Sequence, residues 1–200
     1  MKKQTVLRTA FIAMFSAIIC IGCFIKIPFG LIPLVFQNIL CILCAVLLGG
    51  INGVFPTLIF LLAGSIGLPV FSGGSGGFSV WLSPTGGFLL GYLLGALVSS
   101  LLAGKPKLEE KFFSWKNLLR LSLSVLIGMI VIYIPGVLWF LHWVKKAGQL
   151  PEGTSVLSYA FASCVFPFIL GDLIKVFIAV PVAVKLRPLV AMYLYEQNDE

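Results

Sequence analysis

The sequence predicts an all-α integral membrane protein with six transmembrane helices, and two observations lead to this fold class. First, 60% of the 200 residues are apolar and only 10% are charged, with a mean hydropathy of +1.09, whereas soluble domains are about 45–50% apolar and about 25% charged. Second, no charged residue or histidine occurs between Lys26 and Lys105, which leaves room for three spans of about 20 residues. A soluble globule and a disordered chain are both excluded, because so much apolar surface requires lipid around it.

Proline and glycine divide the first half of the chain into helices. The first apolar run follows Met1-Lys-Lys and lasts for a full span, which favours a transmembrane helix over a cleaved signal peptide. Pro28 and Pro33 end this helix, and Gly49 and Gly50 separate the second span from the third. The expected spans cover residues 8–25, 34–49, 52–66, 86–103, 118–141 and 167–186, and we expect them to pack as one domain over residues 1–200.

The basic residues predict that both termini are cytoplasmic. With this orientation ten Lys and Arg residues flank the spans inside and three lie outside, as the positive-inside rule requires. The net charge of +7 is mostly this bias and no nucleic-acid-binding motif accompanies it, so nucleic acid is not an expected partner. The inside residues are Lys2, Lys3, Arg8, Lys105, Lys107, Lys111, Lys116, Arg120, Lys185 and Arg187, and the outside ones are Lys26, Lys145 and Lys146.

Two pairs of cysteines resemble a zinc-binding pattern but lie inside apolar runs. Cys20 and Cys23 form the first CxxC pair, and Cys41 and Cys44 form the second. Thiolates are costly to form in such surroundings, and cysteine is at home there as a small apolar residue. We therefore expect no metal.

The chain has a single histidine, His142. Enzymatic acid–base or metal chemistry needs at least a second partner group, so an enzyme is not expected. With the neighbouring tryptophans, His142 is expected at the membrane interface.

Small residues form stripes on two of the expected helices. Gly87, Gly91, Gly95 and Ser99 recur every four residues on the fourth span, and such a stripe favours close packing against another helix of the same chain. The first span carries a similar face. This face consists of Ala10, Ala13 and Ala17. Spacing alone leaves open whether it packs internally or against a partner protein.

Asp172 and Lys175 are the clearest candidate for a functional site. With Pro167 in the first turn of the last span, they lie about 8 Å and 12 Å along the helix, on one face. Ionisable groups in a membrane cost a few kcal/mol and usually face the bundle interior or a polar cavity. The alternative is an ion pair that only holds the bundle together.

The outer loop 67–85 is rich in glycine, and it either bends closely around a ligand or is a flexible turn.

Three sequence motifs stand out: Gly67-Leu-Pro-Val-Phe-Ser-Gly-Gly with Ser83-Pro-Thr-Gly-Gly-Phe in the outer loop, Gly171-Asp-Leu-Ile-Lys175, and Val35-Phe-Gln-Asn38. Together they resemble the BioY family, the biotin-specific S components of energy-coupling-factor (ECF) transporters, over essentially the whole chain. Ser83 departs from the glycine expected there. The resemblance implies the S-component fold, a biotin pocket near the outer surface of a prokaryotic cell membrane that the loop 67–85 closes, and no cofactor. It also implies that Ala13 and Ala17 bind the transmembrane coupling subunit, and that two cytoplasmic ATPase subunits supply the energy while this chain hydrolyses nothing.

The chemistry of biotin suggests roles for the candidate residues. Asp172 can accept a hydrogen bond from a ureido N–H, and Lys175 can either donate to the ureido oxygen or pair with the tail carboxylate; this choice stays open. An S component for another vitamin and a solitary facilitator are the alternatives, the second disfavoured because no internal repeat is visible. The other expected substrate-binding residues are Gln37, Asn38, Phe71, Gly73, Gly74, Ser75, Phe78, Ser79, Trp81, Thr85 and Gly86.

Overall fold

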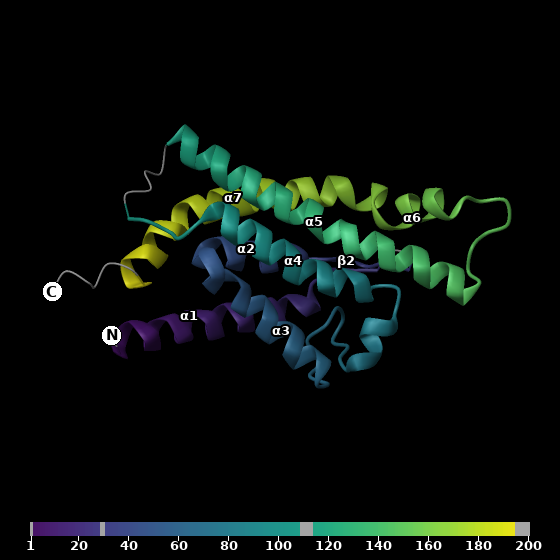
Figure 1. Ribbon diagram of the computed structural model, residues 1–200, viewed down its shortest axis with the longest axis horizontal. Coiled ribbons are helices and arrows are strands. Elements are labelled where there is room, and N and C mark those ends of the chain that lie inside the picture. The colour runs from purple at the N-terminus through teal and green to yellow at the C-terminus, as the bar shows by residue number, and fades with distance from the viewer. Residues whose placement is uncertain (1, 29–30, 109–113, 195–200) are drawn as a thin grey trace.

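A computed structural model describes residues 2–28, 31–108 and 114–194 of the chain. The described residues form a helical bundle with one short β-hairpin (Figure 1). The elements are α1 (Lys2–Ile21), η1 (Gly22–Phe24), β1 (Lys26–Ile27), β2 (Leu34–Val35), α2 (Gln37–Leu48), η2 (Gly50–Val54), α3 (Phe55–Ser65), η3 (Phe78–Leu82), α4 (Gly86–Ala103), α5 (Trp115–Ala147), α6 (Val156–Cys164) and α7 (Phe166–Leu194).

Six of these helices correspond to the six expected spans. Within the described residues, four apolar helical stretches are long enough to cross a membrane, and two shorter apolar ones, Gln37–Leu48 and Gly50–Ser65, lie between them in sequence. The long stretches are Gln4–Phe24, Gly86–Ala103, Trp115–Ala147 and Val156–Leu194. The all-α membrane fold predicted from the sequence is thus confirmed, although the last two helices are longer than expected.

Besides the short 3-10 helices, the structure contains two features that were not predicted. The first is the hairpin, in which Lys26 pairs with Val35 and Ile27 with Leu34; its strands are too short to show an alternating pattern. The second is α6, a helix of nine residues that ends at Cys164, where Val165 leaves the helical conformation (φ −120°, ψ −64°) just before the new helix that carries Pro167. Nine residues are too few to cross a membrane, so hydropathy does not find them.

The glycine stripe of α4 packs against α5, as the sequence predicts. A Cβ atom on Gly91 would lie 2.5 Å from the backbone oxygen of Ile132, and one on Gly95 would lie 2.7 Å from that of Gly128. Such distances are shorter than a van der Waals contact, so only glycine allows the two helices to approach this closely. The α4–α5 pair is consequently a close helix–helix contact.

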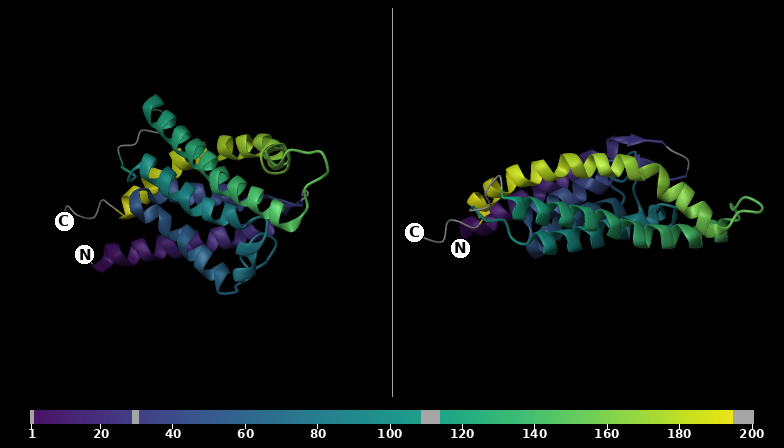
Figure 2. Two further views of the ribbon diagram at one scale, coloured as in Figure 1. Left: turned by 45° about the vertical axis from the view of Figure 1, so that its right-hand side comes forward. Right: turned by 90° about the horizontal axis from the view of Figure 1, so that it is seen from above.

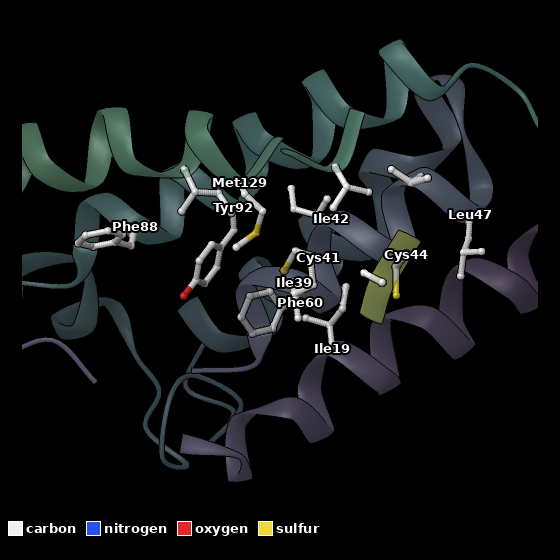
Figure 3. Packing of buried hydrophobic residues seen from close by; sticks show 14 of the residues in the cluster. Ile19, Ile39, Cys41, Ile42, Cys44, Leu47, Phe60, Phe88, Tyr92 and Met129 are labelled. Atoms are coloured by element: carbon white, nitrogen blue, oxygen red, sulfur yellow. The ribbon is translucent and has the colours of Figure 1, made fainter. Parts of the chain in front are cut away.

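Helix α2 forms the centre of the core. Figure 3 shows Cys41 and Cys44 of α2 among Ile19 of α1 and Phe60 of α3. Both cysteines are buried with free thiols. Within the described ranges, no group of three or more His, Cys, Asp or Glu side chains is placed to hold a metal ion. The cysteines pack there as small apolar side chains.

The bundle has two distinct ends. Both described chain ends, the end of α4 and the start of α5 lie at one end, and the hairpin strands, the loop before α4 and the link from α5 to α6 lie at the other (Figures 1 and 2). Most of the predicted inside basic residues belong to segments at the end with the termini; Lys111 lies outside the described residues. The orientation of that end toward the cytoplasm remains a prediction.

Arg187 is placed differently from the expected loop position. It lies within α7, is fully buried, and donates hydrogen bonds to the backbone oxygens of Val46, Ala103 and Gly104. The bonds to the two oxygens at the end of α4 are 3.1 Å long. The last carbonyls of a helix have no partner in their own helix, so one guanidinium holds the ends of α2 and α4 together.

Candidate functional site

A cavity of about 280 Å³ opens at the hairpin end of the bundle. Its size is near the lower limit of ligand pockets, about 300–1,000 Å³. The apolar part of its wall consists of Leu31, Ile32, Pro33, Val35, Phe71, Val80, Pro84, Phe88, Leu89, Ile132, Cys164 and Phe168. The polar part consists of Lys26, Gln37, Asn38, Ser72, Ser75, Ser83, Thr85, Tyr92, Tyr133, Asp172 and Lys175.

Asp172 and Lys175 form a buried ion pair in the wall of this cavity. They lie three residues apart on α7, which places both side chains on one face of the helix. The Asp172 Oδ1 atom is 2.8 Å from the Lys175 Nζ atom. Lys175 is only 4% exposed and Asp172 only 7%, so the pair is removed from solvent as the sequence predicts.

The Lys175 ammonium has an acceptor for each of its three N–H groups. Besides Asp172 at 2.8 Å, it donates to the Val35 backbone oxygen at 2.8 Å and to Asn38 Oδ1 at 3.2 Å. Its nitrogen also lies 5.8 Å from the centre of the Phe36 ring, a distance typical of a cation–π contact. Lys175 thus joins α7 to the hairpin and to α2.

The Asp172 carboxylate is held through both oxygens. Oδ1 accepts hydrogen bonds from Lys175 and from the Asn38 amide nitrogen at 3.1 Å, and Oδ2 accepts from the Tyr133 hydroxyl. The Asn38 side chain is itself oriented, because its oxygen also accepts from the Ile39 backbone N–H at 2.8 Å. We call Asn38, Tyr133, Asp172 and Lys175 the polar cluster. It joins α2, α5 and α7 at one place.

Aromatic rings form much of the remaining wall. Phe88 of α4 meets Tyr133 edge to face, with ring centres 6.2 Å apart and planes at 83°. Phe71 of the outer loop is 1% exposed and meets Phe60 of α3 edge to face at 5.5 Å. Edge-to-face contacts of this kind are favourable between aromatic rings. A polar group and an apolar ring system on one ligand would both find complementary surfaces here.

The outer loop is tied down and not a free turn. Phe71 and Ser75 are joined by a backbone hydrogen bond of 2.9 Å, and Gly73 N–H donates to the Cys23 oxygen at 3.0 Å. Gly73 has a φ of +75°, which favours glycine. The Gln37 amide nitrogen donates to the backbone oxygens of Val70, at 2.8 Å, and of Ile19, at 3.2 Å. These bonds fasten the loop to η1 and α2, and Gln37 also joins α2 to α1.

Ser83 closes the turn that leads into α4. Its hydroxyl donates to the Val80 oxygen at 2.6 Å and lies 2.9 Å from the Thr85 hydroxyl, while its backbone oxygen accepts from the Trp139 indole at 2.8 Å. Its φ of −76° suits any residue. The departure from glycine at this position therefore introduces no strain and adds hydrogen bonds.

The structure brings together part of the set of candidate residues. Those that line the cavity are Gln37, Asn38, Phe71, Ser75, Thr85, Asp172 and Lys175. Those outside the lining are Gly73, Gly74, Phe78, Ser79, Trp81 and Gly86. Phe78 is 69% exposed and therefore lies on the surface of the loop. The Trp81 indole donates to the Ser65 hydroxyl at 2.9 Å and so joins the loop to α3.

Sequence reasoning did not find Tyr133 or Lys26. Tyr133 is a lone tyrosine in the middle of the apolar run of α5. Its polar hydroxyl within a membrane span was the signal that could have identified it as a site residue. Lys26 directly precedes the charge-free stretch that runs to Lys105, but only the hairpin brings it to the cavity wall.

The small-residue face of α1 is exposed. Ala10, Ala13 and Ala17 point away from the bundle, whereas Phe15 and Ile19 on the same helix are buried. The structure thus leaves this face free of internal contacts in the part of the chain that it describes.

The chain is similar to proteins of known family over nearly its whole length. The BioY family matches it over residues 1–192. The chain belongs to the BioY family. The biotin transporter BioY of Thermotoga maritima is 35% identical over 178 residues, which cover 88% of this chain and 92% of that protein. The biotin transporter BioY of Rhodobacter capsulatus is 34% identical over 169 residues, covering 82% and 85% of the two chains.

A solved structure agrees with this family assignment. The crystal structure of the S-component for biotin from an ECF-type ABC transporter superposes with a TM-score of 0.77 at 27% identity, covering 94% of each chain. The BioY fold predicted from the sequence motifs is therefore confirmed. With its several long apolar helices, this BioY family member is a multi-pass protein of a prokaryotic plasma membrane.

Proposed function

We propose that this BioY family member binds biotin as the S component of an ECF transporter and captures it outside the cell for ATP-driven import. The observation that carries the proposal is the polar cluster in the wall of a largely apolar cavity, in a chain whose relatives are biotin transporters. Biotin has a compact polar ureido ring, an apolar sulfur ring and an apolar tail, which match this division of the wall.

Asp172 is the proposed acceptor for the ureido group. Its carboxylate accepts from a ureido N–H, and the Asn38 amide and the Tyr133 hydroxyl lie on its two oxygens and can exchange hydrogen bonds with the ligand. Charge-assisted hydrogen bonds to a carboxylate are among the stronger ones in proteins. Phe71, with Phe88, supplies apolar contact area for the rings of the ligand.

Energy is proposed to come from other subunits. The sequence contains neither GxxxxGK[ST] nor GxGxxG, the glycine-rich motifs that hold nucleotide phosphates. A transmembrane coupling subunit and two cytoplasmic ATPase subunits would complete the transporter, and the chain would act as a binding protein and not as an enzyme. The exposed face of Ala13 and Ala17 is the proposed contact with the coupling subunit, because small side chains allow close helix packing.

The proposed orientation puts the cavity outside. The positive-inside rule assigns the termini and the link from α4 to α5 to the cytoplasm, and the cavity lies at the opposite end of the bundle. The loop 67–85 would then cover the ligand from the outer side.

The test is an equilibrium titration of the detergent-purified protein with biotin, followed by intrinsic tryptophan fluorescence. Trp139 is a suitable reporter, because it is hydrogen-bonded to Ser83 in the cavity wall. Thiamine and riboflavin serve as controls. Saturable binding of biotin alone is the expected result. Binding of another vitamin instead would favour an S component of different specificity, and no binding by a folded, monodisperse sample would contradict the proposal. Biotin uptake in vesicles without partner subunits would favour a solitary facilitator.

A further inference from the structure

The charges that line the cavity do not balance. Three charged side chains lie in its wall, Lys26, Asp172 and Lys175. Asp172 and Lys175 neutralise each other at 2.8 Å. Lys26 is left as one uncompensated positive charge beside a largely apolar space, and such a space is complementary to a ligand with one negative charge.

The Lys26 ammonium has no partner among the residues that the structure describes. In residues 2–28, 31–108 and 114–194, no hydrogen bond or ion pair joins its ammonium to another side chain. The Ser72 hydroxyl, which also lines the cavity, is buried and likewise unpaired within those residues. Two donors without acceptors therefore lie in the same wall, one on the hairpin and one on the outer loop. A carboxylate, which only accepts hydrogen bonds, would satisfy both.

The hairpin and the outer loop hold Lys26 in place. Lys26 pairs across the hairpin with Val35, whose carbonyl binds Lys175. On its other side the lysine side chain passes over Gly73, where a Cβ atom would collide with it. The hairpin and the outer loop thus set the position of the ammonium, and both segments also line the cavity.

Lys175 is poorly suited to the same task. Its three N–H groups already bind Asp172, Val35 and Asn38, and an additional carboxylate would have to displace one of these acceptors. Breaking a buried ion pair leaves an uncompensated charge, which is strongly destabilising. Lys26 is exposed at the cavity, and it can bind a carboxylate without giving up an existing acceptor among the described residues.

We infer that Lys26 is the residue that binds the tail carboxylate of the ligand, so that the polar cluster receives the ureido end and Lys26 the acidic end. This inference rests on the proposed function and specifies which charged group the site recognises. It resolves the choice that sequence reasoning leaves open for Lys175.

The experiment compares biotin with biotinamide, in which the carboxylate is replaced by a neutral amide. Both ligands are titrated into the wild-type protein and into Lys26→Ala, Lys26→Arg and Lys145→Ala. Lys145 is an exposed lysine at the same end of the bundle and outside the cavity wall, so its variant controls for general electrostatic attraction. Monodispersity and melting temperature show that each variant is folded.

The wild-type protein is expected to bind biotin roughly tenfold more tightly than biotinamide. Lys26→Ala removes this difference by weakening biotin alone, Lys26→Arg keeps most of it, and Lys145→Ala changes neither affinity. Equal wild-type affinities for the two ligands would overturn the role of Lys26 and leave biotin binding intact. Equal weakening of both ligands by Lys26→Ala would assign the lysine to the hairpin structure instead. Failure of the wild-type protein to bind either ligand would contradict the proposed function itself.

Discussion

Tyr133 of α5 donates a hydrogen bond to Asp172 of α7, and this bond joins two helices across the wall of the cavity. The hydroxyl occupies Oδ2 of the carboxylate, while Lys175 and Asn38 occupy Oδ1. Both oxygens are therefore oriented before any ligand arrives. A site in which the acceptor is already held in place loses less conformational freedom on binding.

Replacing Tyr133 by Phe is expected to weaken biotin binding about fivefold. The substitution keeps the ring that packs on Phe88 and removes only the hydroxyl, and one hydrogen bond contributes about 1 kcal/mol. Titration by tryptophan fluorescence measures the change. Tyr159→Phe is the control, because Tyr159 stacks on Phe140 outside the cavity wall. Equal affinities of wild type and Tyr133→Phe would show that this hydroxyl does not orient the binding group.

Replacing Asp172 by Asn is expected to weaken biotin binding by roughly 1–3 kcal/mol, through loss of a charge-assisted hydrogen bond. It also leaves Lys175 buried without a counter-charge, so the melting temperature should fall as well. Glu152→Gln, in the exposed link from α5 to α6, is the matched control. Unchanged affinity in a folded Asp172→Asn protein would remove Asp172 from the binding site and assign the ion pair to bundle stability alone.

Replacing Ala13 by Trp is expected to leave biotin binding intact and to prevent co-purification with the coupling subunit. The exposed face of α1 carries only a small side chain here, and an indole would hold the two helices apart. Ala162→Trp makes the same change at an exposed position of α6 and should assemble normally. Normal assembly of Ala13→Trp would place the subunit contact on another face.

Replacing Gly91 by Ala is expected to lower the melting temperature in detergent. The new methyl group would lie 2.5 Å from the Ile132 oxygen on α5, and overpacking of this kind costs about 1–3 kcal/mol. Gly171→Ala is the control, since a Cβ there would lie 3.5 Å from Leu34, an ordinary contact. A Gly91→Ala protein as stable as wild type would mean that α4 and α5 can separate freely.

Local sequence patterns were sufficient for the membrane fold and for part of the site. A charge-free apolar run requires lipid and therefore helices, glycine every fourth residue places a smooth stripe on one helix face, and the spacing of Asp172 and Lys175 places both on one face of α7. Each of these inferences depends on residues within a few turns of one another, so the periodicity of the helix is enough to make them.

The tertiary structure decided the parts that join distant segments. Tyr133 meets Asp172, Val35 meets Lys175, and the cavity acquires Lys26 only through a hairpin of two-residue strands. The saturation of Lys175 by three acceptors, which directs the carboxylate to Lys26, is likewise invisible in the sequence. The physical reason is that helix periodicity determines which residues share a face of one helix, whereas the packing of the whole bundle determines which faces meet.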